Sequence, residues 1–171
     1  VNEIRERETW DDKKTSAVHT LAPIFIKLPV DKSRAEIDAL LAVCVDYKIT
    51  WVIISNLTKK RETIIEKNDI VDMPGGISGK PVFEKSNLLI HNAYQHYGEQ
   101  LVIVGVGGIF SAADAYEKIK HGATLVQLIT GMIYQWPQLI GEINKGLVEL
   151  LMRDGYTHIS QAVGAYHKTG K

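Results

Sequence analysis

Four short apolar runs, each followed by a helical pattern, constrain the fold of this chain more than any other feature. The runs are nearly continuous rather than alternating, and they cover residues 24–26, 51–54, 101–104 and 125–128. Continuous runs of this length are typical of parallel strands covered on both faces. A strand–helix order repeated in this way predicts an α/β fold with about four parallel strands and flanking helices.

The helical patterns have apolar residues at a spacing of three and four. The positions are Ile37, Leu40, Leu41 and Cys44; Ile90, Ala93, Tyr94 and Tyr97; Ala112, Ala115, Tyr116 and Ile119; Ile140, Ile143, Leu147, Leu150 and Leu151. Ser33 with Glu36 predicts a capping box, and Ser111 predicts the start of the third of these helices. Pro137 suits the first position of the fourth. We also expect a helix within the opening twenty residues and a short one within 157–168.

Two architectures contain such a series of elements. One is a doubly wound sheet, and the other is half of a (β/α)8 barrel. A complete barrel has eight strands and typically about 250 residues, whereas this chain has 171 residues and four predicted strands. A half-barrel on its own would leave two open sheet edges and an uncovered inner face.

The bulk composition excludes several classes of function. Twenty basic residues balance twenty acidic ones, so no nucleic-acid partner is expected from charge. No apolar run approaches the ~18 residues that span a bilayer, which predicts a soluble chain or the soluble part of one. The six histidines have no metal-ligand spacing, so no metal site is expected. Cys44 lies in an apolar helical pattern, which predicts an inert core residue.

Polar residues follow the first two predicted strands, where functional groups of parallel sheets collect. Lys27 is the only charge in its run, and it suits either an exposed loop lysine or a cation held against an anionic ligand. Ser55, Asn56 and Thr58 follow the second strand. Such residues are often simple turn formers, so by themselves they indicate little.

The interval of residues 56–85 is too long for an ordinary connection in a compact domain. It contains "PGGISGKP" at 74–81, in which glycines flank Ser78. Loops of this length are usually functional or disordered. The segment is therefore predicted to be an active-site loop, such as a lid, or a flexible hinge.

The segment "GVGG" at 105–108 lies between a strand and a helix, where phosphates often bind. It fails the dinucleotide fingerprint, because Phe110 stands where the third glycine would be required. In barrels, a phosphate commonly binds at the loops after strands seven and eight. Gly107 and Gly108 after strand seven, with Gly131 after strand eight, would let the backbone approach such a phosphate. Close packing of helix on strand is the alternative explanation for one of these glycines.

Several segments together resemble the quinone-dependent (class 2) dihydroorotate dehydrogenases. They are "PIFIKLPVD", "VIISNLTKKR", "GGISGKPV", "IVGVGGIFSAADAYEKIKHGATLVQLITGMIYQWPQLIGEI" and "DGYTHISQAVGAYH", which cover residues 22–168 in order. The resemblance implies the carboxyl-terminal half of a (β/α)8 barrel, so that residues 1–171 would form a single partial domain. It also implies FMN as cofactor, and oxidation of dihydroorotate to orotate in pyrimidine biosynthesis with a quinone as electron acceptor.

The resemblance assigns a role to individual residues. Lys27 would lie against the flavin, where a cation stabilises the reduced anionic ring. Ser55 would contact the flavin, and Asn56 would bind the substrate. The flavin and its phosphate would be surrounded by Ser78, Gly79, Gly107, Gly108, Ile129 and Thr130.

The chain departs from the family pattern in three places. Leu57 stands where a substrate-binding threonine is usual, and Tyr166 stands where an aspartate is usual. The family's loop with the serine base, of the pattern "NxSSPNTxGLRxLQ", has no counterpart, so no catalytic residue is expected in this chain. We therefore expect the isolated chain to be inactive, with the missing amino-terminal half or a second copy needed to cover the sheet.

The resemblance further implies that a full-length relative associates peripherally with the cytoplasmic side of the inner membrane. Two other readings stay open. In the first, the chain is a non-catalytic half-barrel that self-associates and binds a phosphorylated ligand. In the second, it is an unrelated phosphate-binding barrel enzyme. The second of these leaves "GGISGKP" and the tail unexplained.

Overall fold

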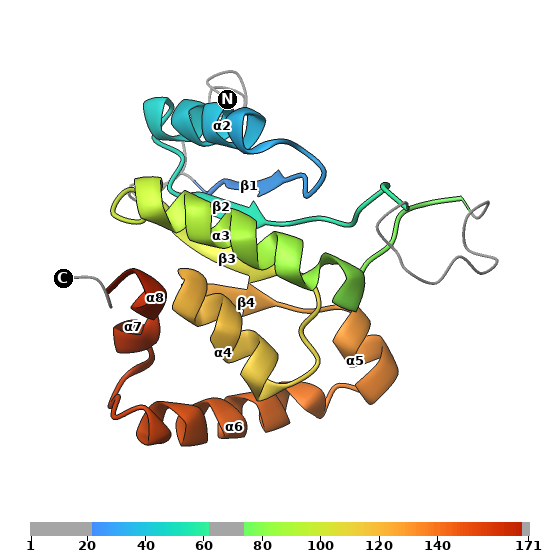
Figure 1. The fold of residues 1–171 in the computed structure, drawn as a ribbon, viewed down its shortest axis with the longest axis vertical. Helices are drawn as coiled ribbons and strands as arrows, with labels where there is room; N and C mark the ends of the chain where they lie inside the picture. Colours follow the sequence, from blue (N-terminus) through green and yellow to red (C-terminus); the bar gives the residue numbers. More distant parts are fainter. Residues whose placement is uncertain (1–21, 62–73, 169–171) are drawn as a thin grey trace, which may run out of the picture.

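The computed structural model describes residues 22–61 and 74–168, which Figure 1 shows as a ribbon. Each strand overlaps a predicted apolar run. The strands are β1 (Phe25–Leu28), β2 (Trp51–Ile54), β3 (Val102–Val106) and β4 (Leu125–Gln127). The helix expected in the opening twenty residues lies outside the described residues.

The four strands form one parallel sheet in the order β1-β2-β3-β4. The register aligns Lys27 with Ile53, Ile53 with Val104, and Val104 with Leu125. A doubly wound sheet reverses its strand order at a switch point, and this sheet does not. The order along the sheet is that of consecutive strands in a (β/α)8 barrel, which is the alternative that the family resemblance implies.

Helices follow the strands at the predicted places. They are α2 (Arg34–Asp46), α3 (Phe83–Tyr97), α4 (Ala112–His121), α5 (Thr130–Gln135), α6 (Leu139–Arg153), α7 (Ile159–Ala162) and α8 (Ala165–Lys168), with the 3₁₀ helix η1 (Lys80–Val82) before α3. The predicted helix at 157–168 is divided into α7 and α8, because Val163 is extended and Gly164 has a positive φ. No described helix is both long and apolar enough to cross a membrane.

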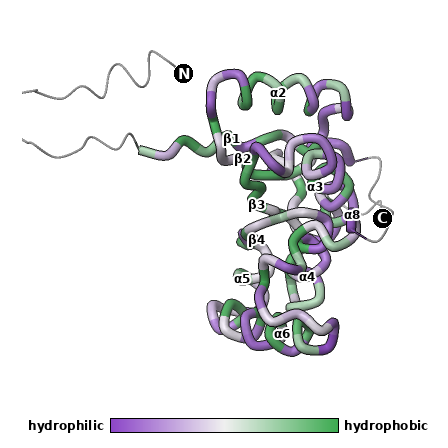
Figure 2. Tube along the Cα trace, turned by 90° about the vertical axis from the view of Figure 1, so that its left-hand side faces the viewer, coloured by the Kyte–Doolittle hydropathy of each residue, from purple (hydrophilic) through white to green (hydrophobic). Residues whose placement is uncertain are grey.

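The helices cover only one face of the sheet. Val52 and Ile103 on that face are completely buried, and Cys44 of α2 belongs to the same core. Figure 2 shows α3, α4 and α8 on one side of the strands. On the other face, Phe25 is 42% exposed and Leu125 is 51% exposed. The expectation that both faces are covered is therefore wrong for the described residues, and the open face is the inner face of a half-barrel.

The helix starts follow local side-chain chemistry. Ser33 and Glu36 form the predicted capping box, and the Ser111 hydroxyl accepts a hydrogen bond from the Asp114 amide. Capping groups of this kind satisfy amides that the helix leaves free. The prediction for Pro137 is wrong, since α6 begins two residues later, at Leu139. A single turn precedes the helix, in which the Ile140 amide donates to the Pro137 carbonyl.

Candidate functional site

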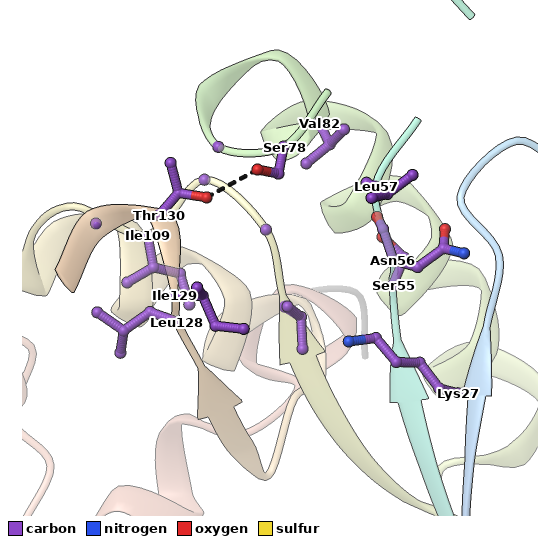
Figure 3. A pocket seen from close by; sticks show the side chains of 15 residues that line it. Lys27, Ser55, Asn56, Leu57, Ser78, Val82, Ile109, Leu128, Ile129 and Thr130 are labelled. Atoms are coloured by element: carbon purple, nitrogen blue, oxygen red, sulfur yellow. Dashed lines mark hydrogen bonds between the residues drawn. The ribbon is translucent and has the colours of Figure 1, made fainter. Parts of the chain in front are cut away.

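A pocket of about 240 Å³ lies at the carboxyl ends of the strands, on the open side of the sheet (Figure 3). Its lining includes every site residue predicted from the sequence. Those residues are Lys27, Ser55, Asn56, Ser78, Gly79, Gly107, Gly108, Ile129 and Thr130. Segments that are far apart in the chain thus meet at one mouth, because parallel strands end at the same edge of the sheet.

Lys27 brings a positive charge to this pocket. It lies near the carboxyl end of β1 and pairs with Ile53 on the open face. The next residue, Leu28, points toward the helices and is 1% exposed. The period of two along a strand therefore directs Lys27 into the pocket and Leu28 into the core. Figure 3 shows the Lys27 ammonium directed toward the middle of the site.

Ser55 and Asn56 continue from β2, and both are held by backbone groups. The Ser55 amide donates to the Val106 carbonyl at 3.3 Å, and the Ser55 side chain is buried. The Asn56 Oδ1 atom accepts from the Val30 amide at 3.0 Å. This bond fixes the orientation of the Asn56 amide group and leaves Nδ2 as its donor.

The two described ends of the long interval come together beside Asn56. Thr58 and Ile77 form an antiparallel bridge with amide–carbonyl distances of 2.8 and 2.9 Å. Asp31, from the loop after β1, accepts hydrogen bonds from the Thr58 hydroxyl at 2.6 Å and the Lys59 amide at 2.7 Å. Lys85 of α3 approaches the same carboxylate at 3.3 Å. The base of the loop is therefore anchored at the pocket rim.

The charge of Asp31 suits this anchoring role. Partial burial by itself would raise the pKa of Asp31, but the hydrogen bonds from Thr58 and Lys59 outweigh that effect. Lys85 contributes in the same direction, and the net pKa lies below its ordinary value. Asp31 is consequently ionised at neutral pH and accepts hydrogen bonds only.

Two hydroxyl groups join the loops on the opposite side of the pocket. Ser78 Oγ and Thr130 Oγ1 lie 2.9 Å apart, and either can be the donor. Ser78 belongs to the "PGGISGKP" segment, and Thr130 follows β4 (Figure 3). Paired hydroxyls at a pocket wall can donate to an anionic oxygen, since each carries one rotatable O–H.

The glycines after β3 form a tight turn between these walls. Gly107 and Gly108 have φ values of +115° and +74°, a region that other residues rarely adopt. A Cβ at Gly107 would lie 2.9 Å from Val82, and one at Gly108 would lie 2.6 Å from Phe83. A Cβ at Gly131 would overlap the Ile109 carbonyl oxygen. Close contact between protein segments therefore accounts for these glycines, in addition to any ligand.

The apolar lining of the pocket was not predicted from the sequence. Val82, Val106, Ile109 and Leu128 line it together with the polar residues above. Their apolar patterns are indistinguishable from those of core residues, so no sequence signal separates them. An apolar slot with one cation and a few hydroxyl groups suits a flat aromatic ring that carries an anionic group. The residues present therefore fit a flavin mononucleotide.

Lys118, which lies behind the glycine turn, was not predicted from the sequence either. Lys118 is 0% exposed, and its Nζ donates to Asn87 Oδ1 at 2.8 Å and to Ser86 Oγ at 3.2 Å. Burial lowers the pKa of Lys118 to about 7. A signal was available, because Lys118 stands three residues after Ala115, within the apolar stripe of its helix.

The family model for dihydroorotate dehydrogenase matches residues 3–151. The chain is 44% identical over 148 residues to the quinone-dependent enzyme of Crocosphaera subtropica, covering 83% of this chain and 39% of that protein. It is 37% identical over 168 residues to the mitochondrial quinone-dependent enzyme of Arabidopsis thaliana, covering 98% of this chain and 35% of that protein. The chain thus spans about two fifths of the length of these curated relatives.

Solved structures give the same fold. Ligand-free dihydroorotate dehydrogenase from Eimeria tenella superposes with a TM-score of 0.80 at 26% identity, over 86% of this chain and 41% of that one. The complex of the Eimeria tenella enzyme with ferulenol gives a TM-score of 0.77 at 28% identity, over 84% and 38%. The predicted half of a (β/α)8 barrel is therefore confirmed.

Proposed function

Because the chain belongs to the dihydroorotate dehydrogenase family, we propose that it supplies the carboxyl-terminal half of the barrel and half of the flavin site of a quinone-dependent dihydroorotate dehydrogenase. The observation that carries the proposal is the meeting of Lys27, the Ser78–Thr130 hydroxyl pair and the Gly107–Gly108 turn at one pocket. These groups come from four separate segments of the chain, and together they supply a cation, hydroxyl donors and a close backbone approach for a phosphorylated ring.

Each group of residues that lines the pocket would contribute differently to flavin binding. The residues of this pocket would hold FMN, which would supply the redox chemistry between dihydroorotate and the quinone. Lys27 supplies positive charge beside the ring and favours its reduced, anionic form. The Gly107–Gly108 turn and the Thr130 hydroxyl hold the phosphate group, and the apolar lining excludes water from the ring.

Asn56 is the substrate-binding residue of the proposal. Its Oδ1 accepts from the Val30 amide, so Nδ2 is the group that donates to a substrate oxygen. Leu57, which lies against Gly76, offers no hydrogen bond where relatives usually have threonine. The substrate therefore has one fewer partner on this side of the site than in the family pattern.

The proton-abstracting base of the reaction belongs to the part of the relatives that this chain does not match. A positioned general base typically contributes about 10²–10⁴-fold to the rate. We therefore expect negligible turnover of dihydroorotate by the 171-residue chain alone. Rapid, FMN-dependent reduction of a quinone-like dye by the purified chain would refute this expectation.

Binding of FMN tests the site itself. The chain is titrated with FMN, and quenching of flavin fluorescence reports binding. In Lys27→Met, the bound flavin should have a more negative reduction potential, by on the order of 30 mV, because the reduced ring loses its cation. Lys145→Met is the matched control, since Lys145 is exposed on α6 and away from the pocket. An unchanged potential in Lys27→Met would contradict the assigned role.

The open face of the sheet favours a second candidate, a self-associating half-barrel that binds a phosphorylated ligand. Phe25 and Leu125 expose large apolar side chains on that face, and such surface normally contacts another protein segment. Either the remaining half of the barrel or a second copy would cover it. Light scattering decides between these two, because a monodisperse monomer in solution would exclude the second copy.

We also propose that a complete enzyme containing this half-barrel associates peripherally with the membrane, as the family resemblance implies.

A further inference from the structure

Lys118 is a buried lysine whose amino group has no ion-pair partner among the described residues. Its Nζ contacts two neutral acceptors, Ser86 Oγ and Asn87 Oδ1, both from α3. The ion pairs in the described part of the chain do not include Lys118; the nearby Asp114 is paired with Lys80 at 2.5 Å instead. Buried charges are normally paired, since an isolated charge in a protein interior is unfavourable by several kcal/mol.

One layer of side chains separates Lys118 from the glycine turn of the pocket. Lys118 Nζ lies 4.8 Å from the centre of the Phe83 ring, and a Cβ at Gly108 would lie 2.6 Å from the Phe83 side chain. Ser86, which accepts from Lys118, donates in turn to the Val106 carbonyl at 2.6 Å. Ser86 Oγ would also lie 3.8 Å from a Cβ at Gly107. The ammonium group is therefore directly behind the turn to which the phosphate has been assigned.

We propose that the ligand's phosphate is the missing counter-charge of Lys118, and that Lys118 makes the pocket prefer a phosphorylated flavin over an unphosphorylated one. This inference rests on the proposed flavin site. Lys118 acts through space and through the Ser86–Val106 contact rather than by touching the ligand. It is a specificity-determining residue and takes no part in the chemistry.

The charged groups around Lys118 define how its protonation responds to a ligand. Burial is the largest effect and lowers the pKa of Lys118, Asp114 and Glu84 raise it without compensating, and Lys80 lowers it further. His121, at the end of the same helix, has its pKa lowered mainly by burial and partly by Lys118. A phosphate dianion at the turn adds a large negative charge to this set. Binding should therefore draw a proton onto Lys118 at slightly alkaline pH.

The first test compares FMN with riboflavin, which lacks the phosphate. Affinities are measured by fluorescence quenching for the wild-type chain, for Lys118→Met and for Lys145→Met. Lys118→Met should weaken FMN binding about tenfold or more, as expected for opposite charges one side chain apart. Its affinity for riboflavin should stay within about twofold of wild type. Lys145→Met should change neither affinity.

The second test needs no substitution. Calorimetric titration of the wild-type chain with FMN at about pH 8, in two buffers of different ionisation enthalpy, measures the protons taken up. A substantial fraction of one proton is expected, because Lys118 is mostly neutral before binding and the FMN phosphate is already dianionic at that pH. Because this test uses only the wild-type chain, it remains valid even if Lys118→Met fails to fold.

The outcomes separate this inference from the flavin proposal. If no flavin binds, but inorganic phosphate raises the Tm of wild type and not of Lys118→Met, then the flavin function fails and the role of Lys118 stands. Equal loss of FMN and riboflavin affinity in Lys118→Met would overturn the inference. So would unchanged FMN affinity, absence of proton uptake, or a wild-type chain that responds to neither FMN nor phosphate.

Discussion

Replacement of Lys118 by methionine should change the stability of the ligand-free chain in a way that depends on pH. Methionine keeps a side chain of similar length but removes the charge from a fully buried position. The wild-type lysine has a pKa of about 7 in the folded chain and 10.5 as its ordinary value. Between these two values the unfolded chain holds one proton more than the folded chain.

The sign and the size follow from proton linkage. Stability rises with pH wherever the unfolded state binds more protons. Below about pH 7, Lys118 is charged in the folded wild type, and this buried charge lowers the free energy of unfolding. As the pH rises, Lys118 loses its proton and the free energy of unfolding increases. Each pKa unit is worth about 1.4 kcal/mol. Between about pH 6 and about pH 9, the wild type should therefore gain about 3 kcal/mol relative to Lys118→Met.

Urea denaturation at the two pH values, in buffers without phosphate, measures the two free energies of unfolding. The comparison uses the difference between wild type and variant, so the titration of other groups cancels. The hydrogen bonds that Ser86 and Asn87 lose are common to both pH values and cancel in the same way. A difference that stays constant within about 0.5 kcal/mol would refute the reasoning, because it would mean that Lys118 keeps its proton in the folded chain.

Three further predictions concern the framework of the site. Gly131→Ala should destabilise the chain by about 3 kcal/mol, because the new Cβ would clash with the Ile109 carbonyl. Gly141→Ala, in open space on α6, should instead stabilise the chain by up to about 1 kcal/mol. Thermal unfolding of both variants measures these changes. Ser33→Ala should lower the free energy of unfolding by about 1 kcal/mol, because α2 loses its capping box, and an equal stability would contradict the cap. Asp31→Asn should lower the free energy of unfolding at neutral pH. The difference from wild type should shrink as the pH falls below about 4, because the pKa of Asp31 is lowered in the folded chain and the wild type loses this contribution when Asp31 is protonated. Urea denaturation at neutral pH and below about pH 4 measures the difference.

The strands and the polar residues that follow them could be predicted because their signals are local. Each apolar run is bounded by residues that favour turns, and a side chain just beyond a parallel strand must lie at the sheet's carboxyl edge. Lys27 and Asn56 were found in this way, whereas Thr130 was assigned only by the family resemblance. Pro137 was misplaced, because a proline suits the turn before α6 as well as its first position.

The apolar lining of the pocket and the role of Lys118 could not be predicted in the same way. Val82 and Ile109 have the same pattern as core residues, and only the packing of η1 and of the turn after β3 places them at the pocket. The alternation of buried and exposed residues in β1 likewise depends on which face the helices cover. Burial is a property of the packed molecule, and a run of apolar letters does not say which side remains open.

The sequence by itself determined the order of the elements, the parallel sheet and the identity of the groups at its edge, because each depends on residues close together in the chain. Only the tertiary structure decided that Ser78 meets Thr130 across the pocket, and that Lys118 lies buried behind Gly107 and Gly108, with neutral acceptors and no ion pair among the described residues. These contacts join segments that are brought together by packing. The balance of charge and burial that they create exists only once the chain has folded.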